Sequence, residues 1–149
     1  LAACLLIKGR KQIEICRYAL QKLQDADVKA FAQAEVDEHE TMKANLKTLG
    51  FAPPAPAAAP AGAPPVPAGV PPMLTVGAVT FAPGLSALVR VDDEVATQCV
   101  ANARAMLDAK AQKGKLDKAF VGHQLHAHHD LLDHAQVFER HASPAMLPT

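Results

Sequence analysis

The residues best suited to chemistry in this sequence are a glutamate, two histidines and two amides at helical spacing in apolar surroundings. Glu35 and His39 lie four residues apart, near the centre of the apolar stripe of a predicted helix, and Gln124 and His128 repeat that spacing further along the chain. Gln12 lies near the apolar stripe of a third helix. Because an unpaired buried charge is strongly destabilising, we expect these five side chains to meet in one interior.

Two imidazoles and a carboxylate on facing helices are a common ligand set for zinc, copper or iron. One interpretation is therefore a metal site at Glu35, His39 and His128, with Gln124 beside it. The alternative is a buried hydrogen-bond network, in which the glutamate pairs with a protonated imidazole and the amides fill the remaining positions. A di-iron centre is disfavoured, because the Glu-x-x-His motif that it uses is absent before both histidines.

Six of the seven histidines lie between residues 123 and 141. On a helix, several share one stripe with carboxylates, away from the apolar face: His123, His126, Asp130, Asp133, His134 and His141. Imidazoles three or four residues apart on a helix can chelate divalent ions, which makes His123, His126, Asp130 and His134 candidate surface ligands. The alternatives are a solvated histidine-rich face and a surface that another helix covers.

Composition excludes several classes of function. The 149 residues include 15 basic and 15 acidic side chains, and this balance argues against a nucleic-acid partner. No apolar run approaches the roughly 18 residues of a transmembrane segment. The sequence has no phosphate-binding loop or nucleophile motif, so an enzyme is not the favoured reading. Residues 1–4 are similar to a lipoprotein cleavage box, which would make Cys4 a lipidation site, but the apolar residues that follow disfavour this.

The elements that must position these residues are helical. Apolar periodicity and capping residues predict helices near residues 3–24, 27–49, 93–113 and 116–142. Residues 52–72 hold nine of the twelve prolines and no charge, which predicts an extended linker, and residues 73–90 are interpreted as an irregular apolar arm. We therefore expect one domain over 1–149, with a helical hairpin at 1–50, a linker and arm at 51–90, and a second helical half at 91–149.

The same periodicity predicts which side chains face the interior of the second half. On the third helix these are Val95, Cys99, Ala103, Met106 and Leu107. On the fourth they are Phe120, Val121, Leu131, Leu132, Ala135 and Phe138. Ser143 and Pro144 have the pattern of an N-cap and first residue of a further helix, which the sequence does not continue.

Several segments together resemble a known bacterial family. They are 13–20 (IEICRYAL), 27–33 (DVKAFAQ), 36–39 (VDEH), 116–124 (LDKAFVGHQ), His128, and 137–139 (VFE) before 142–144 (ASP). These segments resemble the ferritin-like domain of unknown function labelled "predicted outer membrane protein". The resemblance implies an exported four-helix ferritin-like bundle, periplasmic or associated with the outer membrane, whose inward histidines match His39 and His128. It implies no activity.

The sequence departs from that family in three respects. Gln12 stands where an acid is usual, the loop between the halves is much longer, and the last bundle helix is missing. We expect an all-α, ferritin-like up-and-down four-helix bundle with a long Pro/Ala-rich linker. The leading functional hypothesis is non-enzymatic, extracytoplasmic binding of zinc, copper or iron. The alternative is a structural or protein-interaction module that uses the linker and arm, as a homodimer or with another protein.

Overall fold

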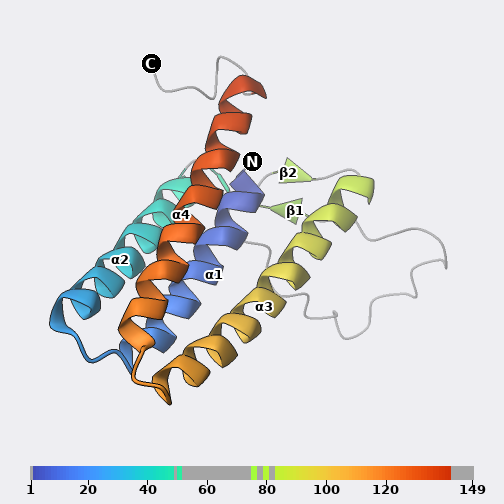
Figure 1. Cartoon of the computed structure of the whole chain (residues 1–149). Helices are drawn as coiled ribbons and strands as arrows, with labels where there is room; N and C mark the ends of the chain where they lie inside the picture. The colour runs from blue at the N-terminus through green and yellow to red at the C-terminus, as the bar shows by residue number, and fades with distance from the viewer. Residues whose placement is uncertain (1, 49, 52–74, 77–78, 81–82, 142–149) are drawn as a thin grey trace, which may run out of the picture.

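The computed structural model describes residues 2–48, 50–51, 75–76, 79–80 and 83–141 (Figure 1). Within these residues the chain forms four long helices and one short hairpin. The helices are α1 (Ala2–Leu20), α2 (Ala26–Thr48), α3 (Pro83–Ala111) and α4 (Leu116–His141). The hairpin pairs β1 (Thr75–Val76) with β2 (Val79–Thr80) in antiparallel register. The prediction of an all-helical chain built on four helices is confirmed.

Successive helices alternate in direction, and α1 lies at the centre of the arrangement (Figure 1). α2 and α3 pack on different sides of α1, and α4 crosses in front of it. α3 and α4 approach each other only near their connecting turn, because α3 diverges toward its Pro83 end. α1, α2 and α4 therefore enclose one interior, and α3 covers the remaining side of α1.

Local capping explains where the helices begin and end. The Asp25 carboxylate accepts hydrogen bonds from the backbone N–H groups of Asp27 and Val28, at 2.9 and 3.1 Å, and so caps α2. Gly50 and Gly114 have positive φ angles of 85° and 62°, and each lies in a Schellman-type pair of hydrogen bonds that closes a helix. Glycine adopts positive φ angles without strain, so these two glycines allow α2 and α3 to end there.

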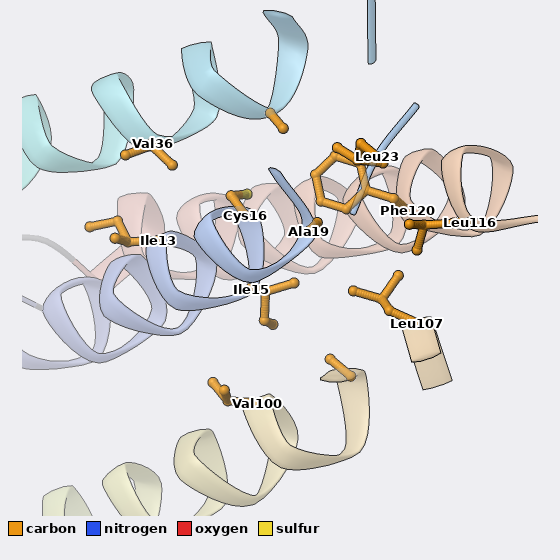
Figure 2. Packing of buried hydrophobic residues seen from close by; sticks show 12 residues of the cluster. Ile13, Ile15, Cys16, Ala19, Leu23, Val36, Val100, Leu107, Leu116 and Phe120 are labelled. Atoms are coloured by element: carbon orange, nitrogen blue, oxygen red, sulfur yellow. The ribbon is translucent and has the colours of Figure 1, made fainter. Parts of the chain in front are cut away.

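The main core lies around the C-terminal half of α1 (Figure 2). Ile15, Cys16 and Ala19 are fully buried, and small side chains at the last two positions let the neighbouring helices approach closely. The residues that pack with them include Val36 from α2, Val100 and Leu107 from α3, and Leu116 and Phe120 from α4. The Phe120 ring meets the ring of Phe31 edge to face, with 6.3 Å between centroids.

The third helix begins at Pro83, about ten residues before the predicted start, so the arm predicted up to residue 90 is wrong for 83–90. Proline is favoured at the first position of a helix, where its missing N–H is not needed. Within residues 73–82, the described part forms the β1–β2 hairpin. The predicted linker at 52–72 lies outside the described residues.

The predicted inner face of α3 is correct at Ala103 and Leu107, and wrong nearer the start of the helix. Val95 is 54% exposed and Cys99 is exposed, whereas the buried side chains follow the spacing of Val89, Ala96, Val100, Ala103 and Leu107. Charged and polar side chains beside this buried face pair with α1. Asp93 contacts Arg10 at 2.8 Å, Arg104 contacts Glu14 at 3.4 Å, and Asp108 accepts a hydrogen bond from Tyr18.

The predicted inner face of α4 is correct only in part. Phe120 is fully buried, but Val121, Leu132 and Ala135 are exposed. The cause is the divergence of α3, which leaves one side of α4 uncovered, and the extension of α4 beyond the start of α1 (Figure 1). Among the described residues, no helix combines the length and apolar character that crossing a membrane requires.

Truncating Phe120 should be strongly destabilising, because this ring is fully buried in the main core. We expect Phe120→Ala to lower the free energy of unfolding by about 3–5 kcal/mol in urea denaturation. Leu125→Ala, one turn away at a position that is 61% exposed, should change it by less than about 0.5 kcal/mol. Equal effects of the two substitutions would contradict the packing described here.

Candidate metal-binding site

The interior enclosed by α1, α2 and α4 contains a carboxylate between two imidazoles. Oε2 of Glu35 lies 3.3 Å from Nε2 of His128 and 3.8 Å from Nε2 of His39. Glu35 and His39 come from successive turns of α2 and are only 5% and 7% exposed. His128 comes from α4 and is about half exposed. The expected convergence of these three side chains is therefore confirmed.

The other ring nitrogen of His128 fixes how this imidazole faces the glutamate. Nδ1 lies 2.9 Å from the backbone carbonyl oxygen of Gln124. A carbonyl oxygen can only accept, so Nδ1 must carry the hydrogen, and in the neutral ring Nε2 then carries a lone pair. Oε2 of Glu35, which is also an acceptor when ionised, lies 3.3 Å from this nitrogen without forming a hydrogen bond. The 3.3 Å contact is consequently favourable only when a proton or another cation lies between the two atoms.

Burial shifts the ionisation of the two α2 groups in the direction that neutralises them. It raises the pKa of Glu35 above its ordinary value of 4.5, against the opposing influence of His128. It lowers the pKa of His39 below 6.5, so this imidazole is held in the neutral form that binds metals. Oε2 of Glu35 and Nδ1 of His39 are both buried with no hydrogen-bond partner among the described residues.

Two amides and a thiol continue the polar interior. Nε2 of Gln124 donates to Sγ of Cys16 at 3.1 Å, and both side chains are fully buried. Burial raises the pKa of the Cys16 thiol to about 12, which keeps it protonated and poorly nucleophilic. The carbonyl oxygens of Gln12 and Gln124 are buried and lack partners among the described residues. The amides thus lie in the predicted interior without completing a network.

A small cavity opens beside the carboxylate cluster, between α1 and the facing sides of α2 and α4. Its volume is about 20 Å³, enough for a water molecule or one ion. His39 and His128 line it together with Gly9, Gln12 and Met42. Gly9 and Met42 were not among the site residues predicted from the sequence. The sequence signal for this position is a glycine inside an apolar helical stripe. Such a glycine often lies where another group approaches the helix closely or where a space is left beside it.

The histidine-rich stripe of α4 has some of its predicted ligands engaged in other contacts. Asp130 is held by Lys8 of α1 at 2.6 Å, and His134 donates from Nδ1 to the backbone carbonyl of Asp130. His123 is partly buried against α1, and His126 is exposed. This stripe thus lies partly against α1, because α4 crosses that helix. A metal ion bound by His123, His126, Asp130 and His134 stays a prediction. The one carboxylate of this set, that of Asp130, already pairs with Lys8.

Among the described residues, no three His, Cys, Asp or Glu side chains already have the arrangement of a metal site. In the cluster of Glu35, His39 and His128 the carboxylate contacts both imidazoles, and a metal there would require small side-chain movements. Because the His128 side chain is half exposed, its imidazole has room to make these movements.

Comparison with known proteins does not assign the chain to a family. No protein-family model matches the sequence, and neither the curated proteins nor the solved structures include a significant match. The site therefore has to be judged from its own geometry.

The lowered pKa of His39 predicts a specific dependence of stability on pH. The native state binds a proton at this ring less readily than the unfolded chain does, so the contribution of His39 to stability is present above about pH 6.5 and lost as the pH falls through its native pKa. In urea denaturation, His39→Leu should lose less stability between pH 7.5 and pH 5 than the unmodified chain. His129→Gln, at an exposed position on α4, should leave the pH dependence unaltered. Identical pH profiles for His39→Leu and the unmodified chain would contradict this account.

Proposed function

We propose that the protein is a non-enzymatic metal-binding helical bundle that holds one divalent transition-metal ion, zinc or copper, between α2 and α4. The ligands are Oε2 of Glu35 and the Nε2 atoms of His39 and His128. The observation that carries the proposal is the 3.3 Å approach of two acceptor atoms, the buried Oε2 of Glu35 and Nε2 of the half-exposed His128. A bound cation turns this unfavourable contact into a bridge.

The spacing of the candidate ligand atoms suits such an ion. Two ligands at about 2.1 Å from a tetrahedral zinc ion lie about 3.4 Å apart. The contacts of 3.3 and 3.8 Å from Glu35 to the two imidazoles bracket this value. The carbonyl that accepts from Nδ1 of His128 supplies the outer hydrogen bond that typically orients a metal-bound histidine. The remaining coordination position would belong to water.

The competing reading of the same geometry is a proton shared between Glu35 and His128. In that case the cluster is a structural network that stabilises the contact between α2 and α4. The two readings differ in their response to metal, because a proton is displaced when a divalent ion takes its place.

The ferritin-like character, the bacterial export and the location outside the cytoplasm remain part of this proposal and depend on the sequence resemblance alone.

An interaction module is the second candidate, and exposed apolar side chains favour it. Leu88, Val91 and Val95 form an exposed row on α3, at spacings of three and four residues. A homodimer through this row would be visible in light scattering.

Zinc titration by calorimetry, on the chain without a histidine tag, tests the proposed site. We expect one ion per chain, and a loss of affinity greater than about 100-fold in Glu35→Gln or His128→Ala, because each removes a ligand rather than an outer hydrogen bond. His126→Ala removes an exposed histidine from the same helix and should leave this affinity unchanged.

Circular dichroism should show that all three variants stay folded. The proposal would be wrong if the unmodified chain bound zinc no more tightly than Glu35→Gln. A stoichiometry that falls with His126→Ala while Glu35→Gln has no effect would place the metal on the histidine-rich stripe instead.

A further inference from the structure

The second ring nitrogen of His39 faces α1. Nδ1 lies 3.7 Å from the point where a Cβ on Gly9 would stand, and the whole residue is only 7% exposed. This nitrogen is buried and has no hydrogen-bond partner among the described residues. Because buried polar atoms in proteins are almost always hydrogen-bonded, Nδ1 requires a partner on the α1 side of the ring.

Gln12 offers a matching group one turn further along α1. Its side-chain oxygen, Oε1, is also buried without a hydrogen-bond partner among the described residues, and the residue is 7% exposed. Gly9 and Gln12 are three residues apart on the same helix, so they lie on one face of α1. Two unpartnered polar atoms, one from each helix, therefore lie at the same contact between α1 and α2.

The small cavity beside the carboxylate cluster connects these two groups. His39 and Gln12 both line it, and its volume of about 20 Å³ suits one water molecule. Lys8 and Lys11 in the lining can only donate, and the carboxylate of Asp130 is already bound by Lys8 at 2.6 Å. A water in this cavity can accept a hydrogen bond from Nδ1 of His39 and donate one to Oε1 of Gln12.

The two sides of the His39 ring indicate which nitrogen carries the hydrogen. In a neutral imidazole one nitrogen carries it and the other has a lone pair. Nε2 is 3.8 Å from Oε2 of Glu35, beyond hydrogen-bond distance, so this carboxylate does not hold the hydrogen on Nε2. A water bound to Gln12 accepts the hydrogen of Nδ1 instead, which leaves the lone pair on Nε2.

We propose that Gln12 is a positioning residue for His39. Through one water in the cavity, its side-chain oxygen holds the hydrogen on Nδ1 and leaves Nε2 free to bind the metal ion. Histidine ligands typically donate their other ring N–H to such an outer acceptor. The consequence for metal binding rests on the function proposed above, whereas the position of the hydrogen can be measured without metal.

Nitrogen-15 NMR of the metal-free chain above neutral pH tests the position of the hydrogen, with the His39 signals identified by their loss in His39→Leu. We expect a neutral ring with its hydrogen on Nδ1. Gln12→Leu keeps the size of the side chain but removes the acceptor, so it should shift the hydrogen toward Nε2. Gln12→Glu keeps an acceptor oxygen and should retain the original tautomer. Gln21→Leu, at an exposed position just after α1, should have no effect.

Zinc calorimetry on the same variants separates this proposal from the previous one. Gln12→Leu should weaken zinc binding by about 10–100-fold, less than Glu35→Gln, and Gln12→Glu should restore the affinity. If zinc binding requires Glu35 but is unchanged in Gln12→Leu, the metal site stands and the role of Gln12 is wrong. A chain that binds no zinc would contradict the proposed function, and the NMR result alone would then decide the role of Gln12. A metal-free His39 ring with its hydrogen on Nε2, or a tautomer that Gln12→Leu does not change, would overturn the proposal whether or not zinc binds.

Discussion

The carboxylate of Glu35, buried between two imidazoles, constrains the arrangement of the three helices around it. Glu35 and His39 occupy core positions on α2, which would otherwise hold apolar side chains, and His128 approaches them from α4. A buried carboxylate is tolerated only where a positive charge or a proton compensates it. The contact between α2 and α4 is therefore both a packing interface and an electrostatic one, and its geometry depends on what lies between Glu35 and His128.

α1 shapes this interior through its small residues. Gly9 allows the terminal methyl of Met42 to approach α1 closely, and the small residues Cys16 and Ala19 bring the other helices close. On its opposite side, α1 is tied to α3 by a cluster in which Tyr18 and Lys22 both bind Asp108. α3 thus supports α1 from outside the site and contributes no side chain to the carboxylate cluster.

Much of this arrangement follows from periodicity in the sequence. Glu35, His39 and Gln124 lie on apolar faces at helical spacing, so their burial was predictable, as were the helices that carry them. The inner face of α3 was predictable at Ala103 and Leu107 but not nearer its start, because packing against α1 decides which side chains are buried there. The exposure of Val121 and Leu132 depends on the divergence of α3, which is likewise a tertiary effect. The cavity combines Gly9 with Met42 across two helices, and no local pattern joins them.

The protonation state of the His128 ring tests the central claim most directly. Nitrogen-15 NMR of the metal-free chain distinguishes the two neutral tautomers of a histidine and its protonated form. The account predicts that Nδ1 of His128 carries a hydrogen throughout, because it donates to the Gln124 carbonyl, and that Nε2 is either bare or protonated together with it. A neutral ring with its hydrogen on Nε2 would make an ordinary hydrogen bond to Glu35. That result would remove the need for a bridging cation and contradict the account.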